Sequence, residues 1–353
     1  MFTPKRSTIL TLLVFLAVII TACAPAPTPV PTAVPSAVPT ATVKPLRVLA
    51  VRLAWKNNAE FAAVHTAMAA GYYADEGFDL KLVEGGTATD FTDVVRGEQE
   101  IGIVASVGGV VNVLSQNLPL VITGAILQKH PMAYVIMADK LTPEQKARPL
   151  EPKDLIGKKV GVQGPQELLA LLTRNGIDKS KVTIQTIQGT NALDVLTGQV
   201  DFAQYWVTNQ VWALQQAGKP YKTLEYWQWG VPLQADVIYT SRDRLQKDPD
   251  TMRRFLRATA KGAAKMLSDP EFAATATLKY GGGYDTPEQL KWRIAAQNER
   301  VTNEDTQTNG LLWVNPDKLM AAFKFYADMA EITKVPKLED IWNMEALKWA
   351  RSN

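Results

Sequence analysis

The residues best suited to chemistry in this chain are aromatic, amide and hydroxyl side chains that fall where strands are predicted to end. An aromatic ring stacks on a planar heterocycle, and such a pair contributes about 0.5–1.5 kcal/mol beyond the area that it buries. An amide offers both a hydrogen-bond donor and an acceptor, which suits a ring edge of alternating C=O and N–H groups. Side chains of these types at strand ends predict a site that binds a ligand. The candidate ligand-binding residues are Trp55, Asn58, Phe61, Ser106, Gln163, Tyr205, Trp206, Asn209 and Gln210.

Some of these residues also have simpler structural interpretations. Ser106 stands at the start of a predicted helix, where a serine commonly serves as an N-cap. Most of the nine tryptophans are expected to pack in the core or between lobes. Asp236 lies on a strand that returns the chain to its first half, where it serves either the hinge or the ligand.

Metal and nucleophile chemistry have little support in the sequence. The only histidines, His65 and His130, are far apart and have no carboxylate pattern around them, so we expect no metal site. The chain lacks a Gly-x-Ser-x-Gly nucleophile motif and a Gly-x-x-x-x-Gly-Lys-Ser/Thr phosphate loop. A nucleophilic hydrolase and an ATPase are therefore both disfavoured, and no cofactor is expected.

The single cysteine, Cys23, follows a short apolar segment near the start of the chain. Lys5 and Arg6 precede the apolar residues 8–20, a run too short to span a ~30 Å hydrocarbon core. The small residues before Cys23 complete the layout of a secretory signal. The ending Thr-Ala-Cys resembles the lipobox of bacterial lipoproteins, which implies a signal peptide over residues 1–22 and a diacylglyceryl group on Cys23.

Residues 23–45 form a predicted stalk between that anchor and a folded region. Prolines recur through this segment among Ala, Thr and Val, and such a composition favours extended polyproline II. Removing Lys5 and Arg6 with the signal lowers the formal charge from +3 to +1, which gives no indication of a nucleic-acid partner. The rest, about 300 residues, is long enough for one large domain or two medium ones.

The folded region alternates between predicted strands and helices in two successive copies. This rhythm is typical of mostly parallel sheets with helices on both faces, and the chain is expected to cross between the two copies twice. Ligands of such sheets bind beyond the carboxyl ends of the strands. Strands are expected at 46–53, 79–83, 101–105, 118–125, 133–138, 158–162, 182–187, 200–203 and 234–240, and the chain after 249 is expected to be helical.

Several stretches of this region resemble the solute-binding proteins of ABC importers. The segments HTAMAAGYYADEGFDLKLVEGG and VVRGEQEIGIVAS, followed by LIGKKVGVQG and ADVIYTSRD, are similar to the NMT1/THI5-like branch of that group. The resemblance implies an α/β, two-lobed periplasmic-binding-protein fold of type II with a ligand cleft between the lobes. It also implies capture of a small molecule by lobe closure and delivery to permease and ATPase subunits at the outer face of the cell membrane. The expected ranges are 46–135 for the first part of lobe 1, 136–235 for lobe 2, and 236–353 for the return to lobe 1 and the C-terminal helices.

Departures from that family pattern bear on the ligand. Anion-binding members usually have Ser or Thr where this chain has Gly164-Pro165-Gln166, so nitrate and sulfonate are disfavoured. Pyrimidine-precursor binders typically begin with Asp-Trp and carry a His a few residues on, whereas this chain has Ala54 and Phe61 at the matching places. Gln210 stands near the place of a common Glu. These changes favour a wider ring with an imide edge, and we expect riboflavin, with a thiamine pyrimidine precursor as the alternative.

An enzyme of the same superfamily is a further alternative. The fungal pyrimidine synthases share the fold but resemble one another in a Cys-rich segment and a reactive His. This chain has no cysteine in its folded region, and Phe61 replaces the matching His. We therefore expect a binding protein and not an enzyme.

Overall fold

The computed structural model describes residues 45–86, 91–189, 192–231 and 233–352. Residues 44–353 form one compact unit. The expected signal peptide, Cys23 and nearly all of the stalk lie outside the described residues. Among the residues that are described, no helix combines the length and the apolar character needed to cross a membrane.

The first of two five-stranded sheets has the order β2-β1-β3-β10-β4. Neighbours β1, β2 and β3 are parallel, whereas β10 runs antiparallel to both β3 and β4. The runs of Val, Ile and Leu predicted as strands are buried here, and all eight residues of β4 are enclosed. The strand bounds are β1 Arg47–Leu53, β2 Phe78–Val83, β3 Ile101–Ser106, β4 Leu120–Leu127 and β10 Ala235–Ser241.

The second sheet repeats this arrangement in the order β7-β6-β8-β5-β9. Here β5 is the antiparallel strand, paired with β8 and β9. Each sheet therefore contains one strand that runs against its neighbours, next to a crossing of the chain from one sheet to the other. The bounds are β5 Met132–Met137, β6 Lys159–Val162, β7 Thr183–Thr186, β8 Phe202–Trp206 and β9 Tyr221–Glu225.

We call the first sheet and its helices lobe 1 and the second sheet and its helices lobe 2. The first crossing precedes Met132, because all of β5 pairs within the second sheet, whereas the sequence placed this boundary after residue 135. The chain returns to the first sheet at β10, which begins at Ala235. The two-lobed α/β prediction is thus confirmed.

The long helices of lobe 1 begin at Asp-Pro, Thr-Pro or Asn-Pro pairs. Proline fits the first helical position, and the preceding side chain accepts a hydrogen bond from a free backbone N–H. This is seen at α10 Pro249–Ser268, α11 Pro270–Tyr280, α12 Pro287–Val301 and α14 Pro316–Asp328.

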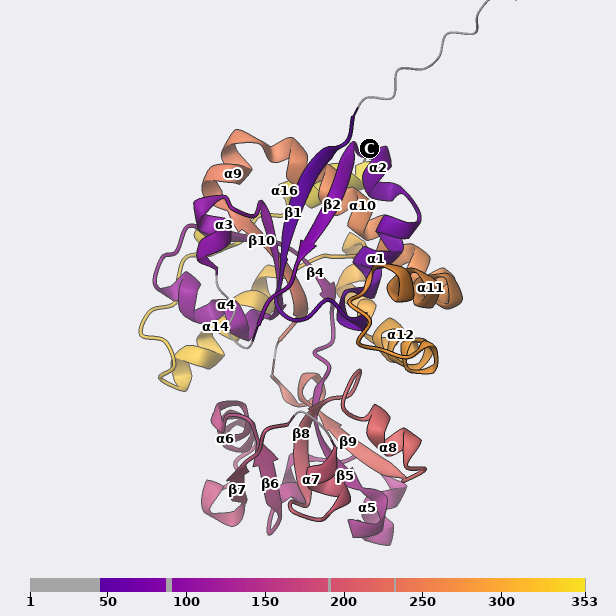
Figure 1. Ribbon diagram of the computed structural model, residues 1–353. Coiled ribbons are helices and arrows are strands. Elements are labelled where there is room, and N and C mark those ends of the chain that lie inside the picture. Colours follow the sequence, from indigo (N-terminus) through magenta and orange to yellow (C-terminus); the bar gives the residue numbers. More distant parts are fainter. Residues whose placement is uncertain (1–44, 87–90, 190–191, 232, 353) are drawn as a thin grey trace, which may run out of the picture. The chain divides into compact units, whose positions relative to one another are not determined.

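Helices cover both faces of the first sheet (Figure 1). Helix α10 packs against α1, α2 and α16, and α14 packs against α4. The remaining lobe 1 helices are α1 Ala62–Ala69, α2 Tyr72–Asp75, α3 Thr92–Arg96, α4 Val107–Ser115, α9 Arg242–Lys247, α13 Glu304–Asn309, α15 Leu338–Ile341 and α16 Glu345–Ser352.

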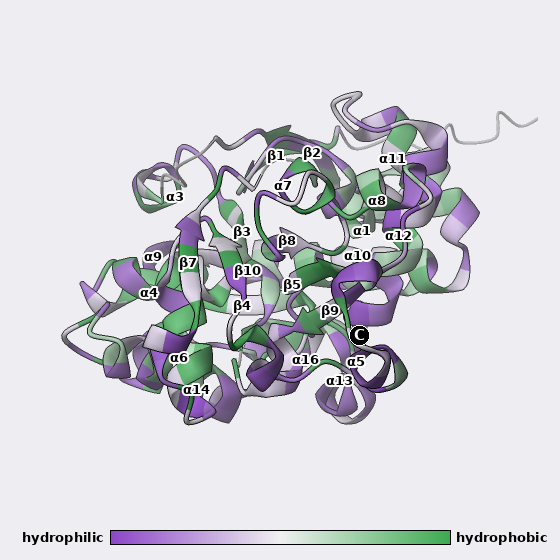
Figure 2. Ribbon diagram, turned by 90° about the horizontal axis from the view of Figure 1, so that it is seen from below, coloured by the Kyte–Doolittle hydropathy of each residue, from purple (hydrophilic) through white to green (hydrophobic). Residues whose placement is uncertain are grey.

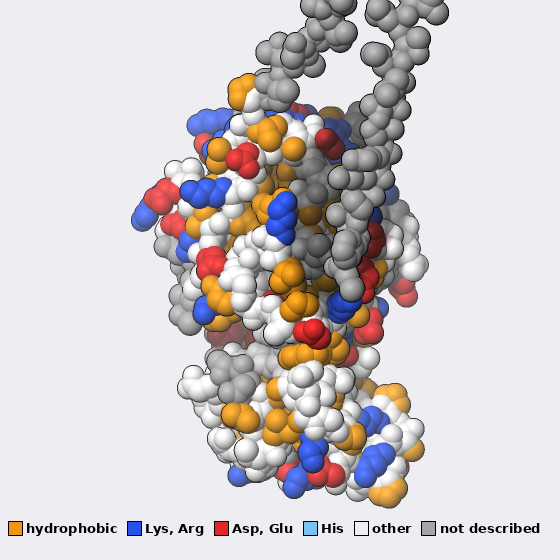
Figure 3. All heavy atoms as spheres, turned by 45° about the vertical axis from the view of Figure 1, so that its right-hand side comes forward, with side chains coloured by type: hydrophobic (Ala, Val, Ile, Leu, Met, Phe, Trp, Pro, Cys, Tyr) orange, Lys and Arg blue, Asp and Glu red, His pale blue; other side chains and the backbone are white. Residues whose placement is uncertain are grey.

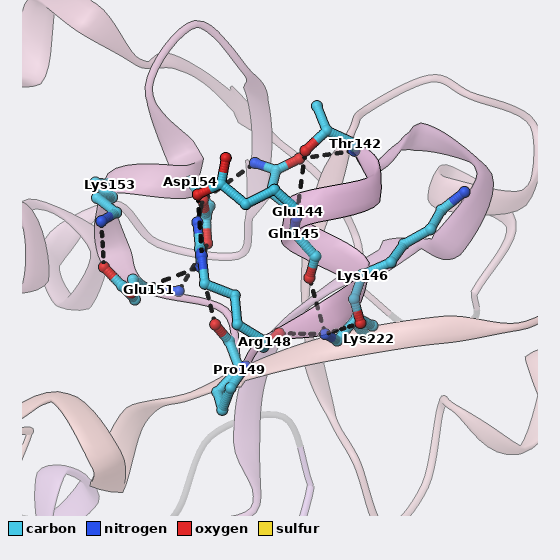
Figure 4. A network of polar contacts seen from close by, with 10 residues as sticks. All are labelled: Thr142, Glu144, Gln145, Lys146, Arg148, Pro149, Glu151, Lys153, Asp154 and Lys222. Atoms are coloured by element: carbon cyan, nitrogen blue, oxygen red, sulfur yellow. Dashed lines mark hydrogen bonds and ion pairs between the residues drawn. The ribbon is translucent and has the colours of Figure 1, made fainter.

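Lobe 2 has shorter helices and a polar network on its outer part. Asp154 accepts two hydrogen bonds from the Arg148 guanidinium, at 2.7 and 2.8 Å (Figure 4). The Lys222 ammonium on β9 donates to the backbone carbonyls of residues 145, 146 and 148, which ties this segment to the sheet. The helices are α5 Pro143–Ala147, α6 Gln166–Arg174, α7 Leu193–Leu196 and α8 Trp212–Gln216.

The hydropathy of the ribbon follows the layers. Hydrophilic and hydrophobic residues alternate around α6, α11 and α14, as expected for helices that bury one side (Figure 2). On the face shown in Figure 3, acidic and basic side chains are intermixed and not separated by sign.

Candidate ligand-binding site

The predicted site residues lie at strand ends in both lobes. In lobe 1, Trp55 follows β1, and Ser106 ends β3 and caps α4. In lobe 2, Gln163 follows β6 and Trp206 ends β8. These are the carboxyl ends of parallel strands, the edge where ligands of α/β sheets bind.

The lobe 1 residues after β1 differ in their exposure. The Trp55 side chain is accessible, with the residue 36% exposed. Asn58 is buried, and its Oδ1 accepts from the Glu60 backbone N–H at 2.9 Å and from Arg293 Nη2 at 3.4 Å. Phe61 is enclosed within the hydrophobic core, so it supports this segment from behind. Trp55 is the aromatic residue of this segment that a ligand can reach in the present structure.

The start of α4 is closely packed around Ser106. The Ser106 hydroxyl oxygen accepts from the Gly109 N–H at 3.4 Å, the N-cap that the sequence also allowed. Gly108 is needed here, because a Cβ at this position would lie 2.2 Å from the Tyr326 hydroxyl oxygen. Burial raises the pKa of Glu167, near the start of α6 in lobe 2, and the neighbouring Tyr326 hydroxyl opposes this rise. Side chains from both lobes therefore meet beside α4.

A chain of buried hydrogen bonds lies behind the lobe 2 strand ends. The Gln163 backbone N–H donates to Gln204 Oε1 at 2.8 Å, and Gln204 Nε2 donates to the Tyr226 hydroxyl at 2.6 Å. That hydroxyl donates in turn to the Tyr134 hydroxyl at 3.0 Å. These hydrogen bonds fix the backbone at residue 163, while the Gln163 side chain remains exposed.

Gln210 uses its amide to hold two backbone segments together. Its Oε1 accepts from the Trp206 N–H at 3.0 Å, and its Nε2 donates to the Gly189 carbonyl at 2.9 Å. The Tyr205 ring is enclosed in the lobe 2 core, and its hydroxyl donates to Asp194 at 3.0 Å. Asn209 is half-buried in the turn that follows Trp206.

Trp206 belongs to an aromatic cluster at the first crossing of the chain. The His130 ring lies 5.4 Å from the Trp206 ring and 6.2 Å from Tyr226, nearly parallel to the latter. His130 Nδ1 accepts from the Met132 N–H at 3.1 Å, and burial lowers the pKa of His130 to about 3. His130 is therefore a neutral packing residue in the physiological pH range.

Helix α12 connects the lobes through buried polar side chains. Arg293 donates from Nε to the Thr208 carbonyl of lobe 2 at 3.1 Å and pairs with Asp285 of lobe 1 at 2.6 Å. Next to the last residue of the helix, Arg300 binds both carboxylate oxygens of Glu225, at 2.9 and 3.0 Å. These contacts fix the position of α12 against the lobe 2 strand ends.

A match to a family model covers residues 58–273 and carries the description NMT1/THI5 like. This segment is more than half of the 353 residues. The chain belongs to the NMT1/THI5-like family.

Two relatives are similar to this chain in sequence. The riboflavin-binding protein RibY of Chloroflexus aurantiacus is 27% identical over 344 residues, 89% of this chain and 92% of RibY. A formylaminopyrimidine-binding protein of Halalkalibacterium halodurans is 21% identical over 239 residues, 66% of this chain and 70% of that protein.

The solved structures support the fold alone, since their sequence identities are low. A putative periplasmic sulfonate-binding protein of an ABC transporter, SsuA from Methylobacillus flagellatus KT, has a TM-score of 0.63 and 14% identity, and the match covers 88% of this chain and 95% of that one. The desulfurization enzyme DSZB has a TM-score of 0.57 and 14% identity, and the match covers 86% of this chain and 99% of that one. This member of the NMT1/THI5-like family therefore has the fold of ABC-import solute-binding proteins, a fold that also occurs in an enzyme.

Two neighbouring acidic side chains, Asp236 and Glu60, lie near the return crossing of this NMT1/THI5-like protein, and only Asp236 was singled out from the sequence. Asp236 is fully buried on β10 at φ +50°, an unusual conformation for a residue other than Gly, and neither of its carboxyl oxygens has a hydrogen-bond partner among the described residues. Burial, together with the nearby Glu60 charge, raises the pKa of Asp236 well above its usual range. A buried carboxyl group without a hydrogen-bond partner is more stable in its neutral form, so Asp236 favours the protonated state.

A pocket lies elsewhere, at the two crossings. It has a volume of about 540 Å³ and is lined by residues of both crossing segments and of the segment around α13, including Gln128, Trp227, Gln234 and Asn303. None of the predicted site residues lines it. The predicted site and this crossing pocket are thus two separate candidates, which an experiment can distinguish.

Proposed function

We propose that this chain is the solute-binding lipoprotein of an ABC importer and that its ligand is riboflavin. The observation that carries the proposal is the similarity to RibY over 89% of the chain, together with aromatic and amide side chains at the strand ends. The proposal agrees with the imide-edge chemistry predicted from the sequence.

The flavin ring would bind between the lobes. Trp55 of lobe 1 and Trp206 of lobe 2 would stack on its faces, and the exposed Gln163 amide would pair with the imide edge. Asn58, Ser106 and Asn209 would shape the polar ends of the site, while Phe61, Tyr205 and Gln210 hold its walls. Ligand contacts to both lobes would favour the closed arrangement.

A thiamine pyrimidine precursor is the second candidate. The observation in its favour is the similarity to a formylaminopyrimidine-binding protein over 66% of the chain. The smaller pyrimidine would make fewer stacking contacts, so its affinity should depend less on Trp55 than the affinity for riboflavin does.

Membrane attachment completes the proposal. A lipid on Cys23 would anchor the protein to the outer face of the cell membrane, and residues 24–45 would carry the folded unit away from it. The loaded protein would then deliver its ligand to permease subunits, with an ATPase elsewhere supplying the energy.

Titration of residues 44–353 with riboflavin and with formylaminopyrimidine, followed by tryptophan fluorescence, tests the ligand. Trp55→Ala and Trp227→Ala form a matched pair, because the two side chains are similarly exposed, at 36% and 39%, but belong to the predicted site and the crossing pocket respectively.

Riboflavin should bind to the native protein and about tenfold more weakly to Trp55→Ala, since a stacking contact of about 1.4 kcal/mol corresponds to a factor of ten. Trp227→Ala should bind like the native protein. Loss confined to Trp227→Ala would move the site to the crossing pocket, and saturable binding of the pyrimidine alone would replace riboflavin by the second candidate.

A further inference from the structure

One buried guanidinium contacts both halves of the candidate ligand site. Arg293 lies on α12, and its side chain is 4% exposed. Its Nη2 donates to Asn58 Oδ1 at 3.4 Å, on the segment that follows β1 in lobe 1. Its Nε donates to the Thr208 carbonyl at 3.1 Å, in the lobe 2 turn between Trp206 and Asn209. Arg293 therefore links segments that carry candidate ligand-binding residues of both lobes.

The segment after β1 has further bonds to this helix and to the partner of Arg293. Arg293 Nη1 donates to Asp285 Oδ1 at 2.6 Å, and Asp285 Oδ2 accepts from the Ala59 N–H at 3.0 Å. About one turn along α12, Gln297 Nε2 donates to the Ala59 carbonyl at 2.6 Å. Both backbone polar groups of Ala59 are thus engaged, and the position of the neighbouring Asn58 depends on these contacts.

The link requires a guanidinium and not merely a positive charge. The hydrogen bonds of Arg293 leave from three nitrogens of one rigid plane, so the directions of its three partners are set together. A lysine ammonium on its flexible stem carries the same charge but does not fix three partners in that arrangement. Replacement of Arg293 by Lys therefore separates the effect of geometry from that of charge.

Helix α12 also carries a second buried arginine that bridges the lobes away from the site. Arg300 binds both carboxylate oxygens of Glu225, and its side chain is 7% exposed. Its backbone carbonyl accepts from the Gln128 N–H, next to the first crossing, at 2.8 Å. Arg300 therefore resembles Arg293 in helix, burial and charge but has its partners at the crossing, which makes it a matched comparison.

We propose that Arg293 is a positioning residue that sets the spacing between the lobe 1 and lobe 2 halves of the ligand site. Separation of the lobes at the site would break its hydrogen bond to Thr208, so Arg293 favours the arrangement in which both halves face one ligand. That this ligand is riboflavin rests on the proposed function, whereas the positioning of the two segments does not.

The test compares Arg293→Lys with Arg300→Lys in residues 44–353, the compact unit. Both substitutions keep the charge of a buried arginine on the same helix. A double variant, Arg293→Met with Asp285→Asn, removes both charges of the buried pair and so leaves no unpaired carboxylate. Urea unfolding checks that each variant is folded. The two measurements are amide hydrogen exchange without ligand and the affinities for riboflavin and formylaminopyrimidine.

Without ligand, exchange at residues 57–60 and 206–210 should be about tenfold faster, or more, in Arg293→Lys and in the double variant than in the native protein. Arg300→Lys should exchange like the native protein in these two segments. A merely structural role of Arg293 would instead accelerate exchange along α12 and leave both segments unchanged. Riboflavin should bind about tenfold more weakly, or more, to Arg293→Lys than to Arg300→Lys.

The two measurements separate this proposal from the choice of ligand. If exchange changes as expected but riboflavin does not bind to the native protein, the riboflavin assignment is wrong and the role of Arg293 stands, with formylaminopyrimidine as the remaining probe of affinity. Exchange like that of the native protein at both segments in Arg293→Lys and the double variant would overturn the proposal. Equal affinities of Arg293→Lys and Arg300→Lys for the probe that binds would also overturn it.

Discussion

The buried carboxyl of Glu60 should make the protein less stable as the pH rises. Burial raises its pKa from 4.5 to about 7, against the opposing effects of the Arg293 charge and of the neighbouring Asp236. A carboxyl with a higher pKa in the folded chain than in the unfolded chain binds more protons when folded, so stability falls with rising pH between the two values. The difference between 4.5 and about 7 corresponds to about 3 kcal/mol, at 1.36 kcal/mol for each pH unit.

The substitution Glu60→Gln removes this titration while keeping the shape and hydrogen-bonding capacity of the side chain. Compared with the native protein, the variant should be about 2–3 kcal/mol more stable at pH 8 and nearly equal at pH 5. Urea unfolding followed by circular dichroism at both pH values measures the free energy of unfolding. Taking the difference between the two proteins cancels the other titrating groups.

Asp236→Asn is the control for this experiment. Asn keeps the size of the side chain and tolerates a positive φ better than most residues. The pH dependence attributed to Glu60 should therefore remain, because burial is its main cause. If the native protein and Glu60→Gln lose stability in parallel from pH 5 to pH 8, the carboxyl is not buried as described, and the explanation of its pKa is wrong.

Three further outcomes follow from buried groups. Burial lowers the pKa values of His65 and His130 to about 3, so both side chains remain neutral in the folded chain. Acidification from pH 6.5 to pH 5 should therefore lower the free energy of unfolding by about 2 kcal/mol for each histidine, as measured by urea unfolding. In a His→Gln variant that folds, the share of the substituted histidine should be absent. Gly102→Ala should destabilise by about 1–3 kcal/mol in the same assay, because its Cβ would lie 2.1 Å from the Tyr239 ring, whereas equal stability would mean that the ring moves aside. Burial alone would raise the pKa of Asp154, but hydrogen bonds from its basic and backbone partners hold this pKa at about 2. Asp154→Asn should therefore lower the free energy of unfolding by about 1–3 kcal/mol at pH 7 and by much less at pH 2. An equal decrease at both pH values would contradict this explanation.

The strands and the long helices could be predicted because their signals are local. The strand predicted at 46–53 is found at Arg47–Leu53, and the Asp-Pro, Thr-Pro and Asn-Pro pairs mark the actual helix starts. The first crossing was placed a few residues late, because β5 is a mostly apolar run from its first residue, Met132, and nothing in that run indicates which sheet it joins.

The candidate site was less predictable, because several of its groups come from distant segments. Arg293, Glu167 and Tyr326 lie within ordinary amphipathic helices, where a charged or phenolic side chain normally indicates only a solvent-facing position. Their pairing depends on how the helices pack. Sequence position likewise did not show that the Gln210 amide is already engaged by the backbone at Trp206.

The antiparallel strands next to the two crossings, β5 and β10, also restrict the order in which the protein can fold. The strands of lobe 2 come from one continuous stretch, Met132 to Glu225. Lobe 1 is complete only when β10 has paired between β3 and β4, so Ile103 on β3 has no strand partner on that side until Ile238 on β10 is present. Non-local strand pairs form slowly, and unpaired strand edges expose the chain to aggregation. During synthesis or export from the N-terminus, the first sheet therefore stays divided until lobe 2 has passed, and lobe 2 is the part that can fold first.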